Sequence, residues 1–192
     1  MHRLLIALSL LPLALVQAHE HPAHDSLGTH EHGVATLDVA LEGKQLDIAL
    51  NSPAINLVGF ERPPANASER NALAQARQHL QSPEKLFALP AQAGCSLSAQ
   101  HLHSPLFHDH DHDHDHDHDH DHDHSDHAKG HSHTDIEASY SFLCQTPTAL
   151  QGLDLATFFQ TFPGTEKITV QLIDPSGQQG LETIPGKSRI PF

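Results

Sequence analysis

The chain has 192 residues and a formal net charge of -14, more than half of which comes from eight aspartates in one short tract. An acidic tract of this kind points to cations as partners and excludes nucleic acid. The length allows one domain of ordinary size plus an insert, and no segment is long and apolar enough to embed the chain in a membrane.

Residues 1–18 have the pattern of a secretory signal peptide. They read MHRLLIALSLLPLALVQA, with a basic start, an apolar run and small residues at the end. The run is too short to span a bilayer stably. We therefore expect cleavage after Ala18 and a soluble protein of the periplasm, residues 19–192; an uncleaved anchor is the alternative.

Cleavage after Ala18 would create a new amino terminus that reads His19-Glu20-His21. A free amine, two amide nitrogens and an imidazole in third place form a tetragonal set of four nitrogens, which suits copper(II) or nickel(II). His19 and His21 are therefore a candidate site for these metals. The alternative is a frayed terminus that is only rich in histidine.

Residues 30–51 predict a β-hairpin with one buried face. Apolar residues alternate with smaller or polar ones on both sides of a turn at 42–44. These residues are Val34, Leu37, Val39 and Leu41 before the turn and Leu46, Ile48 and Leu50 after it. His30 and His32 precede the hairpin, and extended backbone there would direct both imidazoles to one side as half of a metal site. Alternatively, they only end a histidine-rich leader.

Two helices are expected after a proline-rich connection. Asn66 followed by Glu69 is a capping-box pattern, and apolar residues repeat at helical spacing as far as Leu80. Ser82-Pro83-Glu84 opens a second short helix that we expect to reach Leu89. Both helices are predicted to cover a sheet.

The stretches 94–103 and 135–144 alternate as a second pair of antiparallel strands. The expected register sets Cys95 opposite Cys144, Leu97 opposite Phe142, Ala99 opposite Tyr140 and His101 opposite Ala138. The two cysteines are the only ones in an exported chain, so a disulfide is the expected state, with zinc ligation by the pair as the alternative. The bond would close the base of a long loop.

That loop, residues 101–135, contains an unbroken alternation of histidine and aspartate. Its almost complete lack of apolar residues predicts disorder without metal. Imidazole and carboxylate are ligands for zinc, and also for nickel, copper and cobalt. The tract histidines are His108, His110, His112, His114, His116, His118, His120, His122 and His124, and His127 follows them. A solvated spacer or a proton buffer is the alternative interpretation.

The residues at the two ends of the loop are expected to complete the metal site that His30 and His32 begin. These are His101, His103, His131, His133 and Asp135. The alternative for each is a solvated loop side chain.

The rest of the chain is conventional. The apolar residues over 153–162 indicate a short helix or an irregular edge segment, and their spacing favours the helix. A strand is expected over 168–172, a turn at 174–177 and a short returning strand over 181–184. The predicted fold class is α+β: an antiparallel sheet covered by a few short helices and interrupted by the long histidine-rich hairpin loop.

Several short stretches together resemble the exported zinc-regulated proteins that serve Zrg-type zinc importers. They are His30 to Ala35, Ser52-Pro53-Ala54, Val58 to Glu61, Ser82-Pro83 with Leu86-Phe87, Ala93-Gly94-Cys95, Tyr140 to Cys144 and Phe159 to Pro163. In one departure, Arg62 stands where the family often has histidine, so neither Glu61 nor a complete ligand set is carried over.

The resemblance implies a periplasmic protein that binds zinc and delivers it to an inner-membrane ABC permease. The tract would be a scavenging loop of low affinity. A zinc buffer without a transporter partner is the alternative. We do not expect an enzyme, because the sequence contains no motif such as HExxH.

Overall fold

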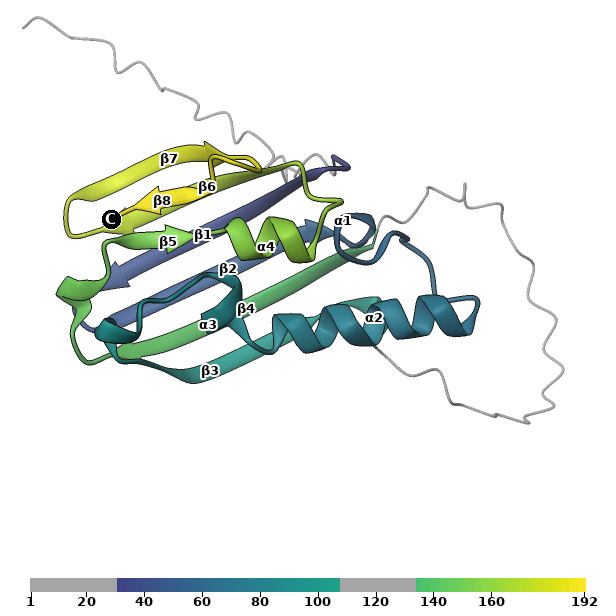
Figure 1. Cartoon of the computed structure of the whole chain (residues 1–192), viewed down its shortest axis with the longest axis horizontal. Coiled ribbons are helices and arrows are strands. Elements are labelled where there is room, and N and C mark those ends of the chain that lie inside the picture. Colours follow the sequence, from purple (N-terminus) through teal and green to yellow (C-terminus); the bar gives the residue numbers. More distant parts are fainter. Residues whose placement is uncertain (1–30, 108–133) are drawn as a thin grey trace, which may run out of the picture.

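The computed structural model describes residues 31–107 and 134–192, and its main feature is a six-stranded sheet (Figure 1). The strand order is β3-β4-β2-β1-β6-β7. The strands are β1 (Val34–Glu42), β2 (Gln45–Pro53), β3 (Cys95–His103), β4 (Asp135–Cys144), β6 (Lys167–Asp174) and β7 (Gly177–Thr183). The hairpin expected over 30–51 is confirmed as β1 and β2, which are joined by a two-residue turn at Gly43 and Lys44.

The sheet is mixed, and the expectation of a purely antiparallel sheet was wrong. Strand β6 pairs with β1 in parallel, with Leu37 opposite Val170, whereas every other neighbouring pair of strands in this sheet is antiparallel. Alternation of apolar residues shows which face of a strand is buried, but it does not show the direction of the neighbouring strand. The α+β class itself holds.

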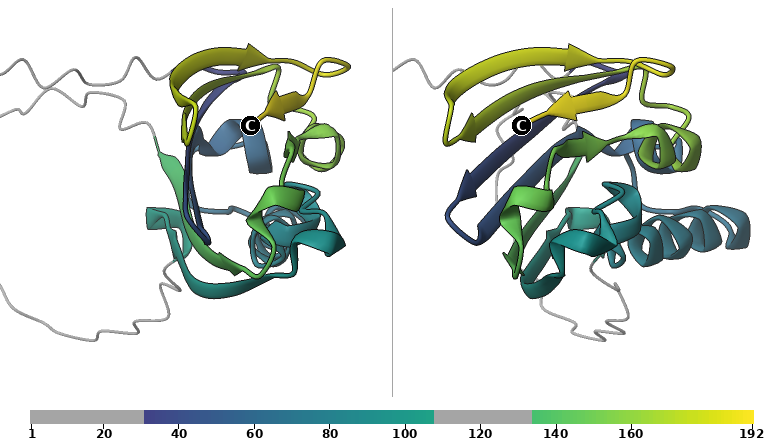
Figure 2. Two further views of the ribbon diagram at one scale, coloured as in Figure 1. Left: turned by 90° about the vertical axis from the view of Figure 1, so that its left-hand side faces the viewer. Right: turned by 60° about the vertical axis from the view of Figure 1, so that its left-hand side comes forward.

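The helices lie on one face of the sheet, which curves around them (Figure 2). They are α1 (Ala54–Val58), α2 (Ala67–Leu80), α3 (Pro83–Leu86) and α4 (Ala156–Thr161), with 3-10 turns at Ala91–Ala93, Pro105–Phe107 and Pro147–Ala149. In the described part of the chain, none of the helices is long and apolar enough to cross a membrane. The helix expected from residue 82 to Leu89 ends early, at Leu86.

The core lies between the helices and the inner face of the sheet. Alternate residues of β1, β2 and β4 are buried, as the pattern predicted. At the end of α2, the carbonyl of Leu80 accepts hydrogen bonds from the Tyr140 hydroxyl at 2.8 Å and from Gln100 Nε2 at 2.9 Å. Burial raises the pKa of Tyr140. These bonds attach the last turn of α2 to strands β3 and β4.

The segment 153–162 differs from the expected single helix. Gly152–Asp154 forms strand β5, which pairs with β8 (Arg189–Pro191) in a separate two-stranded sheet, and α4 begins only at Ala156. The apolar spacing identified the buried residues of this segment, among them Leu153 and Phe158, but not the break between strand and helix. The returning strand β7 begins at Gly177, four residues before the expected start.

The β3–β4 pair contains a bulge that changes the expected register. Cys95 lies opposite Cys144 and the disulfide between them is confirmed. Beyond Leu97 the register shifts by one residue, so that His101 faces Ser139 instead of Ala138. A one-residue shift moves every later side chain to the other face of the sheet. The bulge therefore brings His101 and His103 to the outer face, whereas the expected register would have directed them into the core.

Candidate metal site

A tight turn at the start of β1 presents His32. The Val34 amide donates to the Glu31 carbonyl at 3.1 Å, and Gly33 has a φ of 85°, a left-handed conformation that glycine adopts without strain. His32 therefore stands in a turn rather than in extended backbone. The extended geometry from which we expected His30 and His32 to share one side is not present at His32, and His30 lies outside the described residues.

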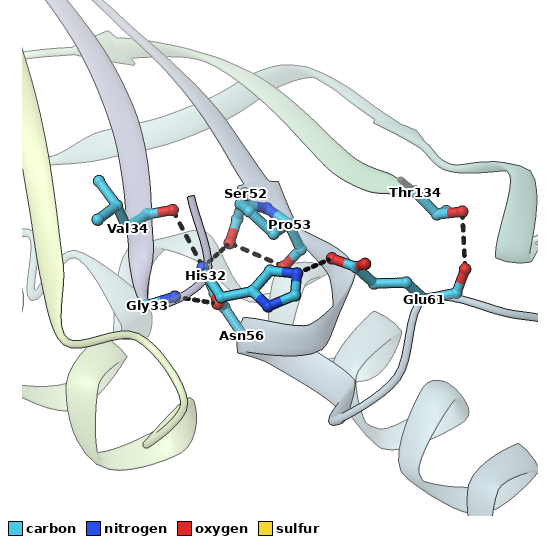
Figure 3. Close-up of polar contacts among 8 residues, drawn as sticks. All are labelled: His32, Gly33, Val34, Ser52, Pro53, Asn56, Glu61 and Thr134. Carbon is cyan, nitrogen blue, oxygen red and sulfur yellow. Dashed lines mark hydrogen bonds and ion pairs between the residues drawn. The ribbon is translucent and has the colours of Figure 1, made fainter. Parts of the chain in front are cut away.

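The imidazole of His32 meets a carboxylate from another part of the chain (Figure 3). Its Nε2 lies 3.0 Å from Oε1 of Glu61, and the two side chains are 52% and 16% exposed. Nitrogen and carboxylate oxygen are both common zinc ligands. The pair thus offers two suitable donors side by side, with the imidazole half exposed and the carboxylate largely covered.

Glu61 reaches this place through the connection that follows β2. Helix α1 starts directly after Pro53 and ends at Gly59, whose φ of 87° reverses the chain. Phe60 is then buried, which directs the neighbouring Glu61 toward β1. The Glu61 carbonyl accepts a hydrogen bond from the Thr134 hydroxyl at 3.0 Å. Glu61 therefore lies between His32 and the residue that leads into β4.

A buried amide holds the His32 turn from the side of β2. Asn56, on α1, accepts from the Gly33 amide at 2.7 Å and donates to the Val34 carbonyl at 3.0 Å and to the Ser52 hydroxyl at 3.3 Å. Asn56 is 3% exposed and Ser52 is fully buried. These bonds join the start of β1 to the end of β2 (Figure 3).

The segment after Glu61 is held by an exposed ion pair. Arg62 donates through both terminal nitrogens to Glu69, at 2.7 and 2.8 Å, and Glu69 also accepts from the Ala65 amide at 2.7 Å. These hydrogen bonds, led by that from Arg62, lower the pKa of Glu69 to about 2. The expected helix cap is confirmed, because Asn66 accepts from the Glu69 amide at 2.9 Å.

This ion pair predicts an acid dependence of stability. The pKa of Glu69 is lower in the folded protein than its ordinary value of 4.5, so the stabilisation is fully present above about pH 4.5 and is lost as the pH falls toward 2. Glu69→Gln should therefore reduce the loss of unfolding free energy between pH 5 and pH 2.5. Urea denaturation at both pH values measures the change in unfolding free energy. The control is Glu84→Gln, which removes an exposed carboxylate on α3. An unchanged pH dependence in Glu69→Gln would contradict the prediction.

His101 and His103 form a second pair, on the outer face of the sheet. Their rings are stacked, with centroids 6.3 Å apart and planes within 6° of parallel. His103 lies opposite Glu137 on β4, whose side chain is also exposed. The prediction that these two histidines share a face is confirmed. Two strands, β4 and β2, separate them from β1 and the His32 turn.

The described residues therefore hold two pairs of donors rather than one complete cluster. Among residues 31–107 and 134–192, no three histidine, cysteine, aspartate or glutamate side chains converge as a metal site would require. Asp135 begins β4 opposite Pro53, at the same end of the sheet as the His32 turn and the end of β3. The sheet thus gathers the candidate ligands at one end without completing a coordination shell from this part of the chain.

Other predicted residues lie outside the described residues. They are the signal peptide 1–18, His19, His21 and His30, the tract His108 to His124, and His127, His131 and His133. The flanks of the insert are more regular than their composition indicated. Residues 101–103 belong to β3, Leu106 is buried in a 3-10 turn, and β4 begins at Asp135.

Two residues of this site were not predicted from the sequence. Asn56 falls within the proline-rich connection of the sequence, and the resemblance does not carry Glu61 over because Arg62 follows it. The signal that could have pointed to Glu61 is the resemblance itself, which includes Val58 to Glu61, whereas Asn56 lies between the stretches that carry the resemblance. The spacing of these residues does not show that Glu61 contacts His32 or that Asn56 contacts the turn, because the contacts join parts of the chain 22 or more residues apart.

Comparison with known proteins gives one family. A family model described as "ZrgA family zinc uptake protein" matches residues 29–192, which include every described residue. No curated protein matches the chain. The matched region begins just before His30 and contains both donor pairs and the disulfide.

Proposed function

The chain belongs to the ZrgA family of zinc uptake proteins, and on that premise we propose that it is a periplasmic zinc-binding protein that captures zinc and delivers it to an inner-membrane ABC importer. Residues 1–18 would be the export signal and 19–192 one zinc-binding domain. The disulfide supports export, because such bonds persist in oxidising compartments.

The observation that carries the proposal is the 3.0 Å contact between His32 and Glu61. Two ligands of a tetrahedral zinc ion, each about 2 Å from the metal, lie about 3.3 Å apart. The pair therefore needs only a small movement to bind zinc through Nε2 and Oε1. The half-exposed imidazole of His32 leaves the pair accessible to an incoming ion.

The remaining ligands of this site would come from the chain segments next to the pair in sequence. His30 is two residues from His32, and His133 precedes Thr134, which is bonded to the Glu61 carbonyl. A closed shell from these four residues would have three neutral imidazoles and one carboxylate, a set that suits zinc. We propose this shell as the tight site.

His101 and His103, together with the tract His108 to His124, would take up zinc more weakly. Imidazoles two apart on a strand can bind one ion, and the tract offers nine further histidines. A chelator that must be ordered as it binds has modest affinity for each ion. The tract would therefore raise the local supply of zinc, with Asp135 and the strand histidines at its base. Nickel, copper or cobalt would bind the same ligands in vitro.

The second candidate function is a periplasmic zinc buffer without a transporter partner. The large number of ligands in the tract favours it. We propose no catalysis, because the family description names uptake. Purified protein mixed with the cognate permease complex would separate the candidates: zinc transfer faster than the spontaneous dissociation of zinc requires a delivery role, whereas equal rates fit a buffer.

Deletion of residues 108–124 tests the division of roles. We expect fewer zinc ions bound per chain and an unchanged tightest affinity, because that site is assigned to residues outside the tract. Calorimetry in competition with a chelator of known affinity measures both quantities.

A matched control for the deletion keeps the length of the insert. Replacement of the nine tract histidines by asparagine preserves the aspartates and the spacing but removes the imidazoles. It should lower the stoichiometry as the deletion does. Loss of the tightest site in either variant would refute the assignment to His32 and Glu61.

A further inference from the structure

The direction of the His32 side chain depends on the turn that carries it. The ring is about half exposed, so packing alone does not determine its place. The turn is defined by the Val34 to Glu31 hydrogen bond and by the left-handed Gly33. Whatever holds Gly33 and Val34 therefore also sets the distance between the imidazole and Glu61.

Asn56 is the side chain that holds these two residues. Its amide oxygen accepts from the Gly33 N–H at 2.7 Å, and its amide nitrogen donates to the Val34 carbonyl at 3.0 Å. An amide side chain presents an acceptor and a donor together in one plane. The two bonds join the Asn56 side chain to consecutive residues at the start of β1 (Figure 3).

Asn56 and the turn are themselves fixed from the opposite side by the start of β6. The Gly33 carbonyl accepts from the Glu166 and Lys167 amides at 2.7 and 3.0 Å. Gly164 packs directly on the backbone of Asn56, where a Cβ would come within 2.7 Å of the Asn56 carbonyl oxygen. The backbone of Gly33 is thus hydrogen-bonded on both sides. The Asn56 side chain accepts from its N–H, and the start of β6 donates to its carbonyl.

Resting on the proposed function, in which His32 and Glu61 bind zinc, we propose that Asn56 is a positioning residue for the zinc site. It does not bind the ion, since its oxygen and nitrogen are engaged with the backbone and it is 3% exposed. It preorganises the His32 turn so that the imidazole faces Glu61 before zinc arrives. Outer-shell partners of metal ligands commonly change affinity 10–100-fold when they are removed.

The test compares the zinc affinity of three variants of the full chain. Zinc is kept below one equivalent, because the ion then occupies the tightest site first. Asn56→Ala should weaken zinc binding about 10–100-fold. Asn56→Asp, of the same shape, keeps an acceptor for Gly33 but sets an oxygen against the Val34 carbonyl, so it should weaken binding similarly if Asn56→Ala does not fold. Tyr140→Phe is the stability control, because it removes the buried bond to Leu80 far from the turn.

A merely structural role would lower the thermal midpoint of all three variants and leave their zinc affinity within about twofold of the parent chain. That result would overturn the inference. A double-mutant cycle adds a second readout: in a His32→Ala background, Asn56→Ala should cause no further loss of affinity, because its effect acts through His32. Additive losses would also overturn the inference.

The cycle separates the inference from the proposed function. If His32→Ala lowers affinity and Asn56→Ala does not, the zinc site stands and the positioning role fails. If His32→Ala leaves the tightest affinity unchanged, the assigned site fails and the positioning role fails with it.

Discussion

Replacement of Glu61 by glutamine is expected to weaken the tightest zinc binding more than 100-fold, and His32→Ala should do the same. The reason is that, in the proposed site, each variant removes a ligand from the ion, a greater loss than the 10–100-fold typical of an outer-shell partner. Glutamine keeps the size of the side chain and its ability to accept a hydrogen bond from the His32 ring. Competition with a chelator of known affinity, in the full chain, measures the change.

The same pair of variants distinguishes two roles for Glu61. If Glu61 only oriented the imidazole through the 3.0 Å contact, glutamine would serve almost as well and the affinity would fall less than about tenfold. The control is Glu137→Gln, an exposed carboxylate of the same sheet that lies beside His103. It should alter only the weaker binding. A small effect of Glu61→Gln alongside a large effect of His32→Ala would contradict ligation by Glu61.

Removal of the disulfide is expected to cost about 4 kcal/mol of unfolding free energy. Cys95 and Cys144 are 49 residues apart, and the loop-entropy relation gives this value for a closed loop of that length. Cys144 is fully buried, so the alanine pair also loses some packing. Urea denaturation of Cys95→Ala/Cys144→Ala measures the loss of unfolding free energy. The reduced parent chain keeps both sulfurs, so its loss reports the contribution of the disulfide bond without the change in packing.

This loss of stability should leave the tightest zinc affinity nearly unchanged while the protein is folded. The disulfide joins the end of β4 to the start of β3, and the His32 turn lies at the other end of the sheet, near Thr134 and Asp135. The His101 and His103 pair also lies away from the disulfide, at the far end of the edge strand β3. A large fall in the tightest affinity would mean that the disulfide, and not the Asn56 network, holds the site together.

Much of the fold was determined by local patterns in the sequence. Period-two alternation identified β1, β2, β4 and β6 and their buried faces, because a strand with one face in the core must alternate. Asn66 and Glu69 defined the start of α2 through a hydrogen bond between neighbours in sequence. The disulfide followed from two cysteines in opposed strands. The zinc-related family was also identified from short motifs, and the family match confirms it.

The tertiary structure alone decided features that depend on contacts between distant residues. The parallel pairing of β1 with β6 requires the path of the chain between them, which alternation does not encode. The bulge after Leu97 displaces His101 to the outer face through a single extra residue, and no composition signal marked it. His32 contacts Glu61, and Asn56 is bonded to Gly33. These contacts bring together the segment that precedes β1 in the chain and the segment that follows β2.

The sequence by itself therefore determined which residues are candidate metal ligands and which faces are buried, because ligand chemistry and hydrophobic periodicity are properties of the local chain. Which ligands meet was decided only by the fold. His101 and His32, which our predicted cluster brought together, are separated by strands β4 and β2, whereas Glu61 reaches His32 through a short helix and a turn. The free energy that selects this arrangement comes from the packing of the whole sheet and its helices, and no single stretch contains it.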